Sequence, residues 1–321
     1  MKKNVAIFTD QKQVKELTRN LCRSSELEYI QSLAQNHYSH NSLLAMYSDW
    51  KNYLEFCQSH HINPLPASVT AIRRFLQIES SKRKFASLKR YTATFGFIHT
   101  VLGYANPVNH RQVQLTLAEL RIQKHGDAKQ TSAFTLSHLN DLNFQLSRSD
   151  NIRDIRDRAI YNVMFECVLK RSELRELKFE SVIVLESGNL NILIGDNSYA
   201  LSTHTSEFLS AWLKHSEATA GPVFRSIDRH GNISNQTLND SSIYRILRNA
   251  SSLLGLAEQY KFSGQSLRVG AAKELSKQGM KVNEIQDLGR WLSPAMPSQY
   301  IGRKGNAAIE MSKFKAIKGW D

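Results

Sequence analysis

The chain has 321 residues, more than one hydrophobic core usually spans, and this length favours two domains. Its 42 Lys and Arg residues against 29 Asp and Glu residues give a formal net charge of +13. Such a positive surface suits a polyanion such as duplex DNA, although charge alone does not identify the partner.

The cysteines and the N-terminus indicate the compartment. Cys22, Cys57 and Cys167 are widely spaced, with no CxxC pair and no histidine cluster of metal-ligand spacing. We therefore expect that the protein lies in the reducing cytoplasm and that it binds neither a metal nor a cofactor. Residues 1–8 begin like a signal peptide, but Asp10 and Lys12 interrupt the sequence before a long apolar stretch forms. No apolar run approaches the roughly 18 residues that span a bilayer, so we expect no membrane partner.

The first 125 residues predict an all-helical domain. A polar lead comes first, and a helix capped by Ser39 or Asn41 follows it. Further helices are expected from about residue 68, from the basic run 81–84 to Gly103, and over 110–124. The apolar residues expected to face inward in the first two are Leu44, Tyr47, Trp50, Leu54, Cys57, Ile72, Phe75, Leu76 and Ile78.

Residues 126–131 are polar and predict a linker to a second domain at 132–321. This domain should contain a long helix over 152–177 and strands at 182–185 and 190–194, separated by a turn at 186–189. Helical patterns return near 205–215, 239–254, 266–278, 282–290 and 305–316. The predicted fold class is mostly α, with a small antiparallel β-sheet in the second domain.

The most informative segment is S-G-Q-S-L-R-V-G-A-A at 263–272, followed by G-R-W at 289–291 and by Tyr300. It resembles the C-terminal signature of the tyrosine recombinases, or phage integrase family. The motif most resembles that of the Cre-like branch, in which His-x-x-Arg-Val-Gly-Ala-Ala precedes Gly-x-Trp and a tyrosine nine residues later. The resemblance implies a helical core-binding domain, a catalytic-type domain and a C-terminal assembly helix.

The resemblance also assigns roles to three residues. Tyr300 matches the nucleophile that attacks a DNA phosphodiester and holds the strand as a 3′-phosphotyrosine. Arg268 matches the second of two arginines that stabilise the phosphate in the transition state. Trp291 matches the position whose ring nitrogen donates to the same phosphate. The alternative is that Trp291 and Tyr300 are simply core and surface aromatic residues.

Three departures from the family pattern predict a degenerate site. Lys170 occupies the place of the first arginine in L-K-R-S-E-L, and Arg171, one helical step of roughly 100° away, is not expected to replace it. Gln265 stands where the family has a histidine, and an amide cannot exchange a proton near neutral pH. The hairpin after residue 190 carries no lysine to protonate the departing 5′-oxygen, and we give His204 little weight as a substitute.

By resemblance, the two domains would clamp opposite faces of double-stranded DNA. Basic and short polar residues at the starts of helices are the candidate contacts, with a solvated basic face as the alternative for the third helix. The DNA-binding candidates are Asn41, Ser42, Met46, Arg83, Lys84, Ser87, Lys89, Arg90, Ser241, Ser242, Tyr244, Arg245 and Arg248.

Residues 307–317 predict a short amphipathic helix that either docks into a neighbouring copy, forming a homo-oligomer on DNA, or folds back on its own chain.

Three functions are compatible with the sequence. The first is a sequence-specific DNA-binding protein of the nucleoid that has lost most of its cleavage activity and acts with other proteins of a mobile element. The second is an active recombinase or integrase that uses Tyr300. The third is a basic helical adaptor unrelated to recombinases.

Overall fold

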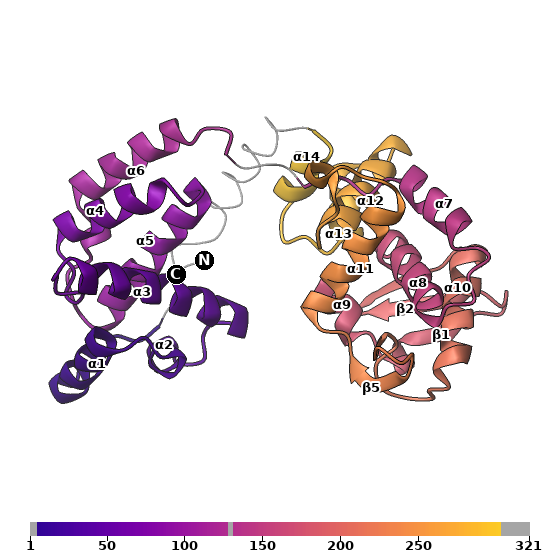
Figure 1. Cartoon of the computed structure of the whole chain (residues 1–321), viewed down its shortest axis with the longest axis horizontal. Helices are drawn as coiled ribbons and strands as arrows, with labels where there is room; N and C mark the ends of the chain where they lie inside the picture. The colour runs from indigo at the N-terminus through magenta and orange to yellow at the C-terminus, as the bar shows by residue number, and fades with distance from the viewer. Residues whose placement is uncertain (1–4, 128–130, 303–321) are drawn as a thin grey trace. The chain divides into compact units, whose positions relative to one another are not determined.

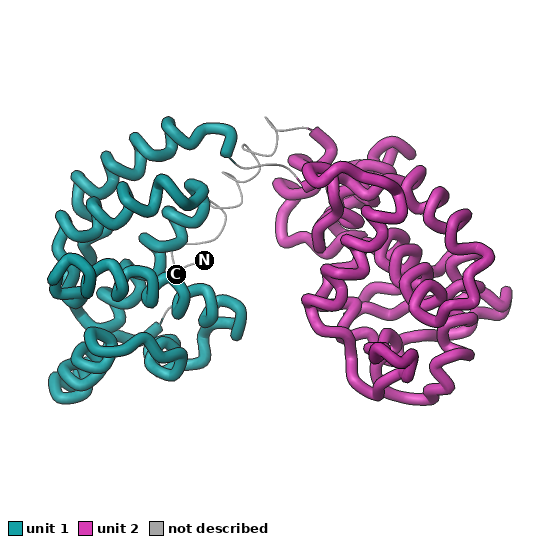
Figure 2. The backbone as a smooth tube through the Cα atoms, in the orientation of Figure 1, with its two compact units in different colours: residues 1–129 teal, residues 130–321 magenta. Residues whose placement is uncertain are grey.

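The computed structural model describes residues 5–127 and 131–302. The chain divides into two compact units, residues 1–129 and 130–321 (Figure 2), and the predicted linker at 126–131 spans this boundary. Each unit has its own hydrophobic core. Within the described ranges, no helix is long and apolar enough to cross a bilayer.

Unit 1 is built from helices around an aromatic core of Trp50, Tyr53, Phe75 and Phe95. Ser39 and Ser68 cap two of these helices with side-chain hydrogen bonds to the first-turn backbone. The helices are α1 (Gln11–Arg23), α2 (Leu27–Ala34), α3 (His40–Ser59), α4 (Val69–Ser80), α5 (Phe85–Val101) and α6 (Arg111–Gln123), with a 3-10 turn at Pro107–Asn109 before α6.

Three expectations for unit 1 were wrong. The predicted polar lead contains two helices, α1 and α2. The sequence pattern of α1 is weak because this helix is mostly polar and packs only a narrow stripe, including Val14, Leu17 and Leu21, against the core. Leu44 is 40% exposed, and Leu43 is buried in its place, since the buried face of α3 runs from residue 43 in steps of four and three. Ile78, also expected inside, is 37% exposed at the end of α4.

Unit 2 packs helices around two small antiparallel sheets (Figure 1). One sheet has the order β1 (Val182–Val184), β2 (Leu190–Ile194) and β3 (Asn197–Ala200), and the other pairs β4 (Arg225–Ile227) with β5 (Ile233–Thr237). The helices are α7 (Leu136–Gln145), α8 (Ile152–Glu166), α9 (Arg171–Glu176), α10 (Thr203–Ser216), α11 (Asp240–Leu253), α12 (Ser266–Lys277), α13 (Val282–Leu288) and α14 (Ala295–Tyr300). Short 3-10 turns lie at Phe179–Ser181 and Glu258–Tyr260. The predicted fold class is confirmed.

The helix expected over 152–177 is broken. The chain leaves α8 after Glu166 and enters α9 at Arg171, and Val168 between them has φ +49°. A β-branched residue in the left-handed region is strained, so surrounding contacts must hold this turn. Strands β3, β4 and β5 were also not predicted. The expected helix at 305–316 lies outside the described residues.

Helix α12 is held close to the start of unit 2. The N–H of Phe134 donates to the carbonyl of Ser266 at 2.9 Å, and a Cβ on Gly270 would overlap the carbonyl of Phe134. Glycine at 270 therefore permits a backbone contact that fixes the position of α12 and of Arg268 on it.

Candidate active site

Arg268, Trp291 and Tyr300 come together from α12, from the segment after α13 and from the end of α14. The Arg268 guanidinium carbon lies 4.2 Å from the centre of the Trp291 ring, a cation–π contact. The rings of Trp291 and Tyr300 lie edge to face, with centres 6.0 Å apart. A Cβ on Gly289 would overlap the Trp291 ring, so glycine at that position allows the ring to lie against its own backbone.

Arg268 is only 2% exposed and is fixed by the backbone. Its Nη1 donates to the carbonyl of Val168 at 2.6 Å, and its Nη2 donates to the carbonyl of Gly289 at 2.7 Å. Burial lowers the pKa of Arg268 to about 10, which leaves it charged at neutral pH. The strained turn at Val168 thus has a clear function in the fold, because it presents a carbonyl to this guanidinium.

Burial raises the pKa of the Tyr300 hydroxyl, and the nearby Arg268 only partly offsets this effect. At neutral pH the hydroxyl is therefore protonated. A phenol in this state becomes a nucleophile only when another group accepts its proton.

A second guanidinium, from Arg290, contacts the turn between α8 and α9. Its Nε and Nη2 donate to the two carboxylate oxygens of Glu173, at 2.9 and 2.7 Å. Its Nη1 donates to the carbonyl of Leu288 at 2.9 Å and also contacts the Tyr199 hydroxyl. Its Nη2 lies 3.2 Å from the carbonyl of Val168, the same oxygen that Arg268 uses.

Arg290 thus joins the α8–α9 turn, strand β3 and the end of α13. Although burial opposes ionisation of Glu173, hydrogen bonds from Arg290 and from Lys170 lower the pKa of Glu173 to about 2. The pair is a partly buried, bidentate ion pair, with side chains 12% and 14% exposed, and it fixes the surroundings of Arg268. We call Glu173, Arg268, Arg290, Trp291 and Tyr300 the braced cluster.

Arg290 and Tyr199 were not among the residues predicted from the sequence. A cation inside the Gly-x-Trp motif and an acid inside L-K-R-S-E-L were the available signals, since buried opposite charges usually pair. Arg290 also adopts φ +53°, which no sequence pattern indicates for an arginine.

The two positions to which the family resemblance assigns proton transfer are exposed, and they carry neither histidine nor lysine. Gln265 is exposed at the start of α12, and no hydrogen bond joins its side-chain amide to a residue within the described ranges. The β2–β3 hairpin closes between Ile194 and Asn197 through Gly195 and Asp196, and Gly195 has φ +58°. We call Gln265 and this two-residue turn the proton-transfer positions.

Lys170 and Arg171 differ in their partners. Lys170 is extended rather than helical, and its Nζ lies 3.0 Å from Glu173. Arg171 is the first residue of α9, and its side chain lies across Gly264, where a Cβ would overlap its Nε and Cδ. The helical separation of roughly 100° does not apply to these two side chains, because Lys170 is extended and only Arg171 is helical.

His204 lies in the first turn of α10, and its ring nitrogen is 3.6 Å from a carboxylate oxygen of Glu207. Its ring stacks on Phe208. Among the residues that the structure describes, no contact joins His204 to the braced cluster.

The DNA-binding candidates of unit 2 lie on α11. Tyr244 and Arg245 are exposed, and the Arg245 guanidinium donates to the Ser242 hydroxyl at 3.2 Å. Arg248 is paired with Glu258, which Lys261 also approaches at 2.7 Å. Ser241 donates to the Asn239 side chain, and the backbone of Ser242 donates to the same oxygen, so both belong to the cap of α11.

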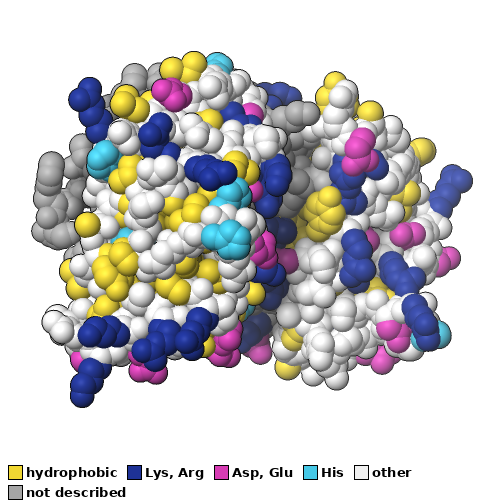
Figure 3. Space-filling view, turned by 60° about the vertical axis from the view of Figure 1, so that its left-hand side comes forward, with side chains coloured by type: hydrophobic (Ala, Val, Ile, Leu, Met, Phe, Trp, Pro, Cys, Tyr) yellow, Lys and Arg dark blue, Asp and Glu magenta, His cyan; other side chains and the backbone are white. Residues whose placement is uncertain are grey.

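In unit 1 several basic candidates are paired with acids. Arg90 makes a bidentate contact with the fully buried Asp49, with a shortest distance of 2.8 Å. Arg83 pairs with Glu79 at 3.2 Å. Lys84 and Lys89 are exposed, as is Asn41, whereas Ser42 bonds to Ser39 and Met46 packs partly against the core. The remaining candidate, Ser87, is half-buried on α5. Figure 3 shows Lys and Arg side chains over both units on the visible face, with acidic side chains among them.

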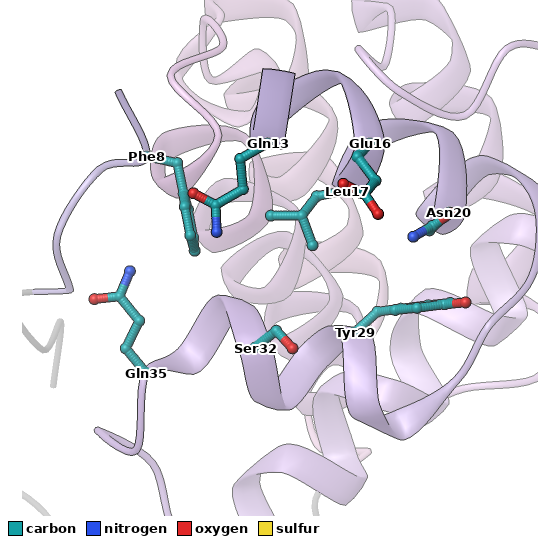
Figure 4. A pocket seen from close by; sticks show the side chains of 8 residues that line it. All are labelled: Phe8, Gln13, Glu16, Leu17, Asn20, Tyr29, Ser32 and Gln35. Atoms are coloured by element: carbon teal, nitrogen blue, oxygen red, sulfur yellow. The ribbon is translucent and has the colours of Figure 1, made fainter. Parts of the chain in front are cut away.

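The structure also has a hollow of about 440 Å³ in unit 1, where side chains from α1 face side chains from α2 (Figure 4). Its lining residues are Phe8, Gln13, Glu16, Leu17, Asn20, Tyr29, Ser32 and Gln35. Glu16 is the charged member of this lining, so the hollow offers no cation for a phosphate.

Comparison with known families places the site in context. Residues 134–305 match the phage integrase family, which covers more than half of the chain and includes the whole braced cluster. The protein therefore belongs to the phage integrase family, the tyrosine recombinases.

Two relatives have similar sequences over most of their length. An integrase/recombinase XerD homologue of Selenomonas ruminantium is 25% identical over 283 residues, which cover 83% of this chain and 82% of the relative. The Cre recombinase of Escherichia phage P1 is 20% identical over 291 residues, which cover 82% and 84%.

Solved structures share the fold. The XerH recombinase bound to its difH substrate superposes with a TM-score of 0.62 at 15% identity, covering 97% of this chain and 90% of XerH. Lambda integrase residues 75–356 on a core site give a TM-score of 0.61 at 17% identity, covering 92% and 95%. At these identities the likeness supports the fold, and residue roles need separate evidence.

Proposed function

We propose that this protein is a sequence-specific double-stranded DNA-binding protein of the tyrosine recombinase family whose strand cleavage is lost or strongly reduced. The observation that carries the proposal is the contrast between an intact, braced cluster and proton-transfer positions with neither histidine nor lysine. The cluster keeps Arg268 and Trp291, two of the groups that the family uses to hold a phosphate, whereas lysine replaces the first arginine at position 170 and the groups that move protons are missing.

The chemistry explains why this combination favours binding over cleavage. Attack by Tyr300 requires a proton acceptor, and departure of the 5′-oxygen requires a proton donor. The amide of Gln265 neither accepts nor donates a proton near neutral pH. Asp196 at the hairpin tip is a carboxylic acid and not the amine that the family uses to protonate the 5′-oxygen. A positioned proton acceptor or donor of this kind typically contributes a factor of about 10²–10⁴ to the rate.

For DNA recognition we propose the exposed face of α11, because Tyr244 and Arg245 are solvent-accessible on one helix. Arg248, held by Glu258, would contact the backbone or reinforce the helix. In unit 1, Asn41, Lys84 and Lys89 are the freest of the candidates, and Ser42, Met46, Arg83, Ser87 and Arg90 complete the proposed surface.

A second candidate function, an active recombinase or integrase, is favoured by one specific observation. Tyr300 packs against Trp291, which in turn contacts Arg268, so the nucleophile is held beside two groups expected to hold the phosphate. A covalent adduct between Tyr300 and a nicked duplex would decide for this alternative.

We also propose a Cre-like arrangement on DNA, with residues 307–317 joining copies into a homo-oligomer. The sequence R-V-G-A-A at 268–272 and the tryptophan at 291 support this arrangement. The partners would be duplex DNA and other proteins of a mobile element, and the compartment would be the cytoplasm, at the nucleoid. Its role would be targeting, integration or regulation of that element.

The DNA-binding proposal is tested by selecting duplexes from a random pool with the full chain and footprinting the selected site. Arg245→Ala should weaken binding to that site by about 1–3 kcal/mol and relax one base position. Arg248→Ala should cost less, because Glu258 already occupies its guanidinium. Selection that yields no common sequence would contradict the proposal.

A further inference from the structure

The guanidinium of Arg171 is unusual in this site because it has no partner. Within residues 5–127 and 131–302, no hydrogen bond or ion pair joins its side chain to another residue. It is half-buried and retains its full set of donors. An arginine held at a partly enclosed place without an acid is poised to bind an anion from outside.

Its position is defined from two sides. Val168, three residues before it, accepts a hydrogen bond from Arg268 on α12. The Arg171 side chain itself lies across Gly264, two residues before α12 begins, where a Cβ would be 3.0 Å from its guanidinium carbon. Arg171 therefore lies beside the Gln265 end of the same helix that carries Arg268.

The charges nearby distinguish Arg171 from its neighbour. Lys170 and Arg290 both contact Glu173, so one carboxylate serves these two cations. Arg171 and Arg268 have no carboxylate partner among the described residues. The site thus keeps an excess of positive charge, and this excess lies on the two guanidinium groups rather than on Lys170.

We infer that Arg171, one residue after the position where the family carries its first arginine, binds a DNA phosphate together with Arg268. The inference rests on the proposed function, since it names the ligand of that same site. The shift is compatible with the backbone, because the turn at 167–170 leaves Lys170 extended and starts α9 at Arg171. Arginine at this position supplies the planar fork that lysine lacks.

The test uses the full chain and its selected duplex in ethylation interference and in affinity measurements over a range of salt. Arg171→Ala should weaken binding tenfold or more and reduce the salt slope by about one phosphate contact. One phosphate whose ethylation blocks the wild type should no longer matter for this variant. Lys170→Ala should weaken binding less than threefold and keep the wild-type interference pattern.

Two further variants separate position from charge. Gly264→Ala keeps every charge but displaces the flexible Arg171 side chain, so it should lose the same phosphate from the pattern. Lys214→Ala removes an exposed cation of α10 and should match the wild type. Thermal melts of each variant show whether it is folded. An unchanged pattern in Arg171→Ala, or loss of that phosphate in Lys170→Ala, would overturn the inference.

Failure of the proposed function would look different, since the wild type itself would give no specific footprint. In that case inorganic phosphate is titrated into the full chain while arginine Nε–H resonances are followed by NMR. The Arg171 resonance should shift and saturate at millimolar phosphate, and the shift should be absent from Gly264→Ala. A resonance that does not respond overturns the role of Arg171 independently of DNA.

Discussion

The braced cluster and the proton-transfer positions lie in the same unit but differ in how they are built. Arg268 and Arg290 are bonded to backbone carbonyls, and Arg290 also forms a bidentate pair with Glu173. Gln265 and the tip of the β2–β3 hairpin are exposed and make no comparable contacts. Holding a phosphate and moving a proton require different groups, so a chain can retain the first capacity while the second decays.

The largest expected effect comes from removing the carboxylate of the braced cluster. Glu173→Ala should destabilise the fold by about 3 kcal/mol or more, because Arg290, whose side chain is only 12% exposed, would keep a largely desolvated charge without its partner. Urea unfolding measures this loss. Glu186→Ala, which removes an exposed carboxylate from a turn, is the matched control and should change stability by less than about 0.5 kcal/mol. Equal effects of the two variants would show that the cluster is not braced as described.

The same pair predicts a dependence of stability on pH. The pKa of Glu173 is lowered to about 2 in the fold from an ordinary value of 4.5. Its stabilisation, roughly 3 kcal/mol, is therefore complete above about pH 4.5 and is lost as the pH falls towards 2. Urea unfolding of the wild type and Glu173→Gln across this range should give curves that converge at low pH. Parallel curves would contradict the low pKa.

Restoring the proton-transfer positions should raise cleavage without changing stability. The double variant Gln265→His with Asp196→Lys should form a covalent DNA adduct about 10²-fold faster than the wild type, which corresponds to about 2.7 kcal/mol. Quantified gels of adduct against time provide the rate. Gln265→Asn with Asp196→Asn alters the same positions without adding a proton donor of the right kind and should give no gain.

The smallest effect is expected from removing the Tyr300 hydroxyl. Tyr300→Phe removes one hydroxyl but keeps the ring that packs against Trp291, so DNA affinity should change by less than about 0.5 kcal/mol. Fluorescence anisotropy on the selected duplex measures this difference. If the variant unfolds instead, Tyr300 is retained for packing.

Sequence could predict the members of the site that follow fixed spacing. Arg268, Trp291 and Tyr300 are such members, because a nine-residue interval and a short motif specify them. The helical pattern likewise predicted the fold class, since apolar periodicity reflects the buried face of each helix.

The contacts that brace the site could not be predicted in this way. They depend on Val168 and Arg290 adopting positive φ, which local propensity disfavours and only tertiary contacts impose. The break between α8 and α9 follows from the same turn, and it decides the direction of Arg171. The expected continuous helix over 152–177 gave the wrong neighbours for Arg171, because helical spacing was applied to residues 167–170, where the chain is not helical.

The most direct measurement is covalent trapping on a nicked duplex that carries the selected site. Cleavage of such a substrate releases a short fragment, so that any phosphotyrosine accumulates. On a duplex that footprinting shows to be fully bound, the wild type should form adduct only at the low level set by the missing proton-transfer groups. Rapid, complete adduct formation that disappears in Tyr300→Phe would contradict a binding function and establish an active recombinase.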